Sequence, residues 1–106
     1  MLLYNGTVSI DVQTIESALG LLGQQGSYRI LRALLEGPLR FGELQERTGL
    51  LPRTQSLRLK EMMAAGWVTR HQFAEVPPRV EYRLTEKARA LEPVLAEVEH
   101  WAERHA

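Results

Sequence analysis

Cysteine is absent from the 106 residues of this chain. Disulfide bonds, thiolate nucleophiles, cysteine-ligated zinc and thiol-based redox switches are therefore excluded within it. Long apolar runs are absent as well, because no stretch approaches the roughly 20 apolar residues of a membrane-spanning helix. The N-terminal stretch MLLYNGTVSID has no basic start and no long apolar segment, so we expect no signal peptide. These absences predict a soluble, cytoplasmic protein with no membrane partner.

Patterns typical of catalysis and metal binding are also lacking. The sequence has no glycine-rich phosphate loop and no cluster of residues with metal-ligand spacing. Of its three histidines, His71 has no acidic or nucleophilic partner nearby in sequence. His100 and His105 fall on different faces of a helix, which disfavours a metal pair. We therefore expect no enzymatic activity, no metal and no cofactor.

Charge is present in ordinary amount but is unevenly distributed. Charged residues make up 25% of the chain and the net charge is zero, yet residues 29–83 hold ten basic against six acidic side chains. Eleven of the thirteen basic residues are arginine, whose planar guanidinium suits phosphates and guanine edges. A basic middle between acidic ends is typical of nucleic-acid-binding proteins, although a mixed solvated surface is the alternative.

Apolar periodicity and helix-end signals predict the order of the elements. Helices are expected at residues 11–22, 27–36, 41–48 and 52–65, followed by a hairpin at residues 67–84 and a C-terminal helix at residues 86–105. Asp11 and Thr85 fit N-caps, and Pro52 fits a first helical position. Pro93 predicts a kink or break, because proline inside a helix costs roughly 3 kcal/mol. We expect a single domain, residues 1–106, of the α+β class and mainly α.

The middle of the chain has the order of a winged helix-turn-helix. A short helix ends at Gly49, a longer helix follows from Pro52, and a strand pair begins after Gly66. The hairpin tip, residues 74–79, contains two prolines that restrict the loop before binding. Arg79 offers a cation to backbone phosphate or the minor groove. The alternative is that the prolines only protect a sheet edge from aggregation.

Four segments resemble the HxlR-type, MarR-like winged-helix transcriptional regulators of bacteria and archaea. They are LRFGELQERTGL, LRLKEMMAAGWVTR, EVPPRVEYRLTEKARAL and VLAEVEHWAERH, and the similarity covers nearly the whole chain from about Ile15. The resemblance implies a homodimer that binds double-stranded operator DNA, with residues 52–65 as recognition helix and dimerisation through the first and last helices. The operator, the direction of regulation and any small-molecule effector stay undetermined.

The chain departs from the family pattern around the helix-turn-helix. Gln25-Gly26 stands in place of a usual Lys-Trp. Leu51 replaces a serine cap, Gln55 replaces a leucine, and Leu57 replaces a polar residue. Gln55 could read an adenine or lie at the edge of the core, and Leu57 could meet a thymine methyl group or be a solitary exposed leucine. Many family members sense oxidants through an N-terminal cysteine, which this chain lacks.

The candidate DNA-contacting residues lie on both helices of the motif and on the wing. Polar side chains in the first turns of a recognition helix usually meet bases, whereas later cations favour phosphates. The set is Arg40, Arg53, Thr54, Gln55, Ser56, Arg58, Lys60 and Arg79. A winged-helix module that binds protein without specific DNA binding is the alternative, because Leu51, Gln55 and Leu57 make the recognition helix less polar.

Apolar stripes on the two end helices predict a second interface. The stripes exceed what a small domain needs to cover one core, so helices from two chains are expected to form an intersubunit bundle. The predicted interface residues are Ile15, Leu19, Leu22, Leu91, Val94, Leu95, Val98 and Trp101. The alternative is that both helices cover the core of their own subunit.

Overall fold

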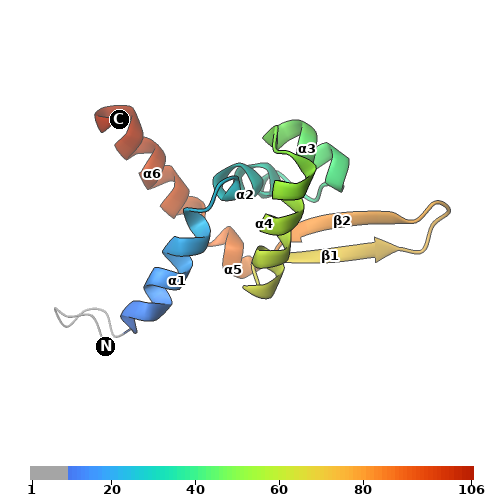
Figure 1. Ribbon diagram of the computed structural model, residues 1–106, viewed down its shortest axis with the longest axis horizontal. Helices are drawn as coiled ribbons and strands as arrows, with labels where there is room; N and C mark the ends of the chain where they lie inside the picture. Colours follow the sequence, from blue (N-terminus) through green and yellow to red (C-terminus); the bar gives the residue numbers. More distant parts are fainter. Residues whose placement is uncertain (1–9) are drawn as a thin grey trace.

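The computed structural model describes residues 10–106, which form six helices and one two-stranded antiparallel sheet (Figure 1). The elements are α1 (Val12–Leu22), α2 (Ser27–Leu35), α3 (Phe41–Thr48), α4 (Pro52–Ala64), β1 (Val68–Phe73), β2 (Arg79–Leu84), α5 (Glu86–Arg89) and α6 (Glu92–His105). The fold is mainly helical α+β, with the helix-turn-helix formed by α3 and α4 and the wing by β1 and β2. The expectation of no signal peptide falls largely on residues 1–9, which lie outside the described residues.

Local signals account for where the helices begin and end. The Asp11 carboxylate accepts a hydrogen bond from the backbone N–H of Gln13 at 2.9 Å and caps α1. Pro52 is the first residue of α4, where its missing N–H leaves no intrahelical bond unmade. The Thr85 hydroxyl accepts from the Ala88 N–H at 3.2 Å and caps α5. These three residues occupy the positions that their chemistry favours.

The C-terminal segment is two helices rather than one kinked helix. The one-turn helix α5 ends at Arg89, and α6 begins at Glu92 with Pro93 in its first turn. Proline fits there because the first N–H groups of a helix have no partner within it. The break expected just before Pro93 is therefore confirmed, and the expected helix at residues 86–105 is two helices separated by a turn.

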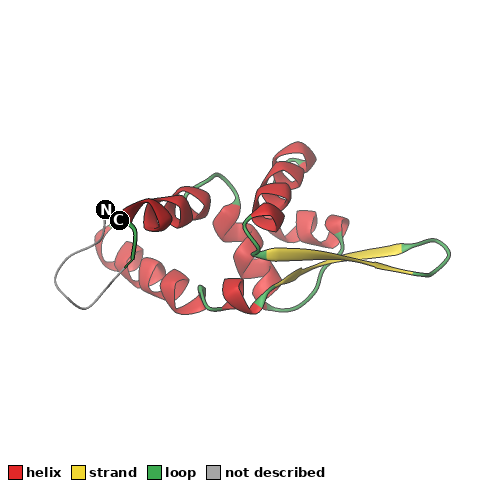
Figure 2. Cartoon of the chain, turned by 90° about the horizontal axis from the view of Figure 1, so that it is seen from below, coloured by secondary structure: helices red, strands yellow, loops and turns green. Residues whose placement is uncertain are grey.

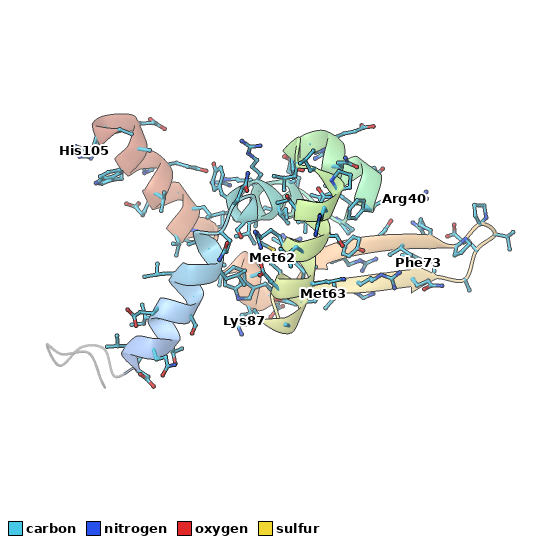
Figure 3. All side chains as sticks on the ribbon, in the orientation of Figure 1. Arg40, Met62, Met63, Phe73, Lys87 and His105 are labelled. Atoms are coloured by element: carbon cyan, nitrogen blue, oxygen red, sulfur yellow. The ribbon has the colours of Figure 1, made fainter. Side chains whose placement is uncertain are left out.

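The hydrophobic core forms where α2 meets the helix-turn-helix and the base of the hairpin. The completely or almost completely buried apolar side chains are Ile30, Leu31, Leu34, Leu44, Leu59, Met62, Val68, Ala88 and Leu95. Figure 3 shows Met62 near the middle of the helical body, on the inner side of α4. Because α4 is buried along one side only, its other side remains available for contacts outside the chain.

The hairpin is tied down at its base and projects at its tip. β1 and β2 pair from Val68 with Leu84 to Phe73 with Arg79. At the base, Leu39 exchanges two backbone hydrogen bonds with Tyr82, at 3.2 and 2.8 Å. The tip, residues 74–78, extends away from the helices (Figure 2). This arrangement presents a long wing beside α3 and α4.

α1 and α6 point away from the body on the side opposite the wing (Figures 1 and 2). None of the eleven residues of α1 is buried, and Leu95 is the one buried residue of α6. Helices that bury so little of an apolar stripe are weakly supported by their own chain. No helix formed by residues 10–106 has both the length and the apolar character required to cross a membrane.

Candidate nucleic-acid interface

The second helix of the helix-turn-helix, α4, has a clear outer face. Residues separated by three or four positions share one side of a helix, and Arg53, Ser56, Leu57 and Lys60 follow that spacing. These four side chains line one shallow depression on the surface of α4. Arg53, Leu57 and Lys60 are exposed, whereas Ser56 is half-buried. The outer face thus combines two cations, a hydroxyl and an apolar side chain.

Gln55 points in the opposite direction and is completely buried. Its amide nitrogen donates to the backbone carbonyl of Phe41 at 3.0 Å, and its amide oxygen accepts from the Thr48 hydroxyl at 3.0 Å. The same hydroxyl accepts from the Leu50 N–H at 3.2 Å. The expectation that Gln55 contacts DNA is wrong, because both ends of its amide are used inside the protein. Gln55 instead joins α4 to both ends of α3.

Arg58 is also buried, at 8% exposure, and it is not available for phosphate. Its Nε donates to the backbone carbonyl of Gln25 at 2.8 Å, and its guanidinium pairs with Glu61. Gly26 beside that carbonyl has φ 89°, and a Cβ there would lie 2.7 Å from Leu50. The left-handed backbone at this turn favours glycine, and a larger residue there would also have to displace the Leu50 side chain. Arg58 fastens α4 to the turn between α1 and α2.

The remaining candidates on the motif keep an outward position. Arg40, Arg53 and Lys60 are exposed, and none has an ion pair among residues 10–106. Arg40 lies at the start of α3, above the hairpin (Figure 3), where its backbone N–H donates to the Glu43 carboxylate at 2.8 Å. Thr54 is half-buried at the edge of the outer face. These cations are free to meet phosphate or base edges.

Arg79 has a different role from the expected one. Its guanidinium forms ion pairs of 2.9 Å with both Glu75 and Glu81 and lies 3.9 Å from the centre of the Phe73 ring. Figure 3 shows Phe73 far along the hairpin, where the two strands approach the tip. Because two carboxylates already neutralise it, Arg79 is not a free cation for phosphate. The unpaired, exposed cation of the described hairpin is Arg70.

Replacing Arg79 with alanine should loosen the distal hairpin without unfolding the body. The change removes two ion pairs and a cation–π contact, each worth roughly 0.5–1 kcal/mol at a partly exposed site. Amide hydrogen exchange of the non-proline residues between 73 and 79 should therefore become about tenfold faster, with little change in the melting temperature. Arg70→Ala is the matched control and should leave exchange unchanged. Identical exchange in Arg79→Ala and wild type would contradict this role.

The predicted dimer residues separate into two groups. Leu95 is 2% exposed and belongs to the core of its own subunit, so its assignment to the interface is corrected. Leu22 and Leu91 are half-buried against that core. Ile15 is half-buried as well. The exposed group consists of Leu19, Val94, Val98 and Trp101, of which Val98 and Trp101 are 53% and 62% exposed. The apolar stripes are thus shared between the core and the outer surface.

A polar cluster fixes α6 against α2. The Glu99 carboxylate accepts two hydrogen bonds from the Arg32 guanidinium, at 2.7 and 2.8 Å, and a third from the Tyr28 hydroxyl. The Arg32 guanidinium, helped by the Tyr28 hydroxyl, holds the pKa of the Glu99 carboxyl below its usual range. The bond to Glu99 raises the pKa of the Tyr28 hydroxyl. The cluster sets the direction in which α6 leaves the body.

No group of three His, Asp or Glu side chains within residues 10–106 is arranged to hold a metal ion.

Residues 21–106 match a family model described as HxlR-like helix-turn-helix. An uncharacterised HTH-type transcriptional regulator of Halalkalibacterium halodurans is 40% identical over 101 residues, covering 92% of this chain and 89% of the relative. The HTH-type transcriptional regulator YodB of Bacillus subtilis is 37% identical over 91 residues, covering 85% of this chain and 81% of YodB.

Solved structures agree with these relationships. The reduced form of YodB has a TM-score of 0.84 and 35% identity, covering 92% of this chain and 96% of that chain. The reduced form of the redox regulator HypR has a TM-score of 0.78 and 33% identity, and the match covers 86% of this chain and 91% of the HypR chain. A thiol-based response cannot operate through the cysteine-free sequence of this chain. Proteins of this kind are transcriptional regulators and not enzymes, and this chain belongs to the HxlR-like helix-turn-helix family of transcriptional regulators.

Proposed function

We propose that this regulator acts as a homodimer on double-stranded operator DNA, with α4 in the major groove and the wing on flanking backbone or minor groove. The observation that carries the proposal is the outer face of α4, where Arg53 and Lys60 are exposed and free of ion pairs among the described residues. Unpaired donors are what base and phosphate recognition requires. Arg40, Thr54 and Arg70 would extend the contact beyond this face. Binding to operator DNA would take place in the cytoplasm.

The exposed apolar residues of α1 and α6 support the homodimer. A two-fold symmetric dimer would cover Leu19, Val98 and Trp101 and would bring two recognition helices to two half-sites. An apolar groove lies between the end helices and is lined by Leu19, Leu22, Gly23, Tyr28, Leu95 and Val98. A small-molecule effector acting there would shift α1 against α6 and change the spacing of the recognition helices.

Arg53→Ala should separate base reading from general attraction to DNA. If Arg53 contacts a guanine edge, its loss costs roughly 1–3 kcal/mol on the operator and little on random duplex. Thermal stability should stay at the wild-type value, because Arg53 is exposed. The measurement is a titration of operator and scrambled duplexes at several salt concentrations. An equal loss on both duplexes would reassign Arg53 to a phosphate.

Lys60→Ala is the matched control on the same face. If Lys60 contacts a phosphate, the substitution should weaken binding to both duplexes alike. It should also lower the slope of log affinity against log salt by about two, because a dimer loses two contacts.

The exposed Leu51, at 72%, is the observation in favour of a protein-binding module. That alternative would be supported if wild type had no measurable affinity for random duplex at low salt, where a basic DNA-binding surface should bind.

A further inference from the structure

Leu57 is an exposed leucine at the centre of the outer face of α4. It is 49% exposed, and it lies in the same depression as Arg53, Ser56 and Lys60. No described element covers it, because the buried side of α4 is formed by other residues of the helix, Leu59 and Met62 among them. On a surface that contacts bases, such an apolar side chain among polar donors is best matched by an apolar group on the DNA.

We propose that Leu57 reads the C5-methyl group of a thymine in each operator half-site. The inference rests on the proposed function, since it places α4 in the major groove. There, the thymine methyl is the largest apolar group that the four bases display, since cytosine offers only a small C5–H at the same place, and the remaining recognition groups donate or accept hydrogen bonds. A leucine side chain can exclude water from that methyl, but it cannot satisfy a donor or acceptor. Leu57 thus favours thymine and disfavours bases that would be left unpaired.

The neighbours of Leu57 support this assignment. Arg53 precedes it by four positions and Lys60 follows it by three, so both share its side of the helix. Both cations are exposed and have no ion pair among the described residues. They can hold the helix against phosphates or a neighbouring base while Leu57 remains at the groove floor. The surface is therefore suited to nucleic acid more than to an apolar protein partner, whose interface core would exclude such unpaired charges.

The test removes single methyl groups from the DNA. The operator is first selected from random duplexes with the full-length protein, and each thymine is then replaced by deoxyuridine in both half-sites. At one position per half-site, wild type should lose about fourfold in affinity for each buried methyl, or roughly 15-fold for the dimer. Leu57→Ala should bind the thymine operator more weakly and should lose sensitivity to deoxyuridine at that position.

Leu51→Ala is the matched control, because it shortens an exposed leucine just before α4 and outside the depression. It should keep the full deoxyuridine effect. Less than a twofold effect at every thymine, or an unchanged effect in Leu57→Ala, would overturn the inference while leaving the proposed function intact. If selection enriches no sequence, the proposed function fails and this inference fails with it. Both variants should melt like wild type, because both leucines are exposed.

Discussion

Val98→Asp should convert the regulator into a folded monomer with greatly reduced operator affinity. Val98 is 53% exposed in the single chain, so an aspartate there meets water and leaves the subunit folded. In the proposed dimer the same carboxylate would be buried without a partner, which costs about 3–5 kcal/mol. The dimer dissociation constant should rise by at least about a hundredfold. Analytical ultracentrifugation at micromolar concentration measures this directly.

The affinity for operator DNA should decrease when the dimer dissociates. Two recognition helices held in one particle bind two half-sites with a high effective concentration, and separate subunits lose that advantage. Binding of a single half-site duplex should change little, because Val98 is remote from the outer face of α4. His100→Asp is the matched control, since it introduces the same charge on the opposite side of α6, where His100 is 61% exposed. Wild-type protein that sediments as a monomer would contradict the proposed dimer.

Helix ends and the order of the elements could be predicted from the sequence because their causes are local. Asp11 and Thr85 cap helices by accepting hydrogen bonds from N–H groups two and three residues away. Pro52 begins α4 because its ring fixes φ near the helical value and its missing N–H is not needed at the first position. Such signals are contained in a few neighbouring residues, so they need no knowledge of the tertiary fold. The division at Pro93 follows from the same rule.

Residue roles were harder to predict where the partner is distant in sequence. Arg58 looked like an outward cation, but its Nε binds the carbonyl of Gln25, 33 residues away. Leu95 and Val98 belong to one stripe, yet they are 2% and 53% exposed, because α2 and the core reach only part of α6. Periodicity identifies an apolar face, and it cannot say which chain covers it.

Arg79 is a case in which a sequence signal existed. Glu75 lies four positions before it, and Glu81 lies two positions after it on the same strand, where side chains two apart share a face. The register that brings Phe73 opposite Arg79 depends on loop length, which the sequence left open. Charge patterning around the wing therefore favours a paired Arg79 over the free phosphate-binding cation that we predicted from the sequence.

Gln55→Glu should be the most damaging change on the motif outside the apolar core. It adds no bulk, but it places a carboxylate oxygen beside the Phe41 carbonyl, which now receives a hydrogen bond from the Gln55 amide at 3.0 Å. Gln55 is completely buried and no cation is among its hydrogen-bond partners, Thr48 and Phe41. An uncompensated buried charge costs about 3–5 kcal/mol. For a domain of this size the melting temperature should fall by roughly 15 °C or more.

The pH dependence of this variant has a defined sign. Burial and the facing carbonyl raise the pKa of the introduced carboxyl in the folded state above its unfolded value of about 4.3. The protonated form is therefore favoured by folding, and the stability it provides is lost as pH rises through the folded pKa. The deficit of Gln55→Glu relative to wild type should thus shrink between about pH 7 and pH 4.

Gln55→Leu separates charge from the loss of hydrogen bonds. It fills a similar volume without a charge, and replacing a buried polar group by an apolar one of similar shape costs little when its partners keep other bonds. The Thr48 hydroxyl still accepts from the Leu50 N–H and can turn its hydrogen toward the Gln45 carbonyl, 3.5 Å away. The expected loss is therefore about 1 kcal/mol and should not depend on pH. Thermal melts of both variants and wild type at several pH values make the comparison. If Gln55→Glu melts like wild type at neutral pH, the Gln55 side chain must be reachable by water and would be available to DNA after all.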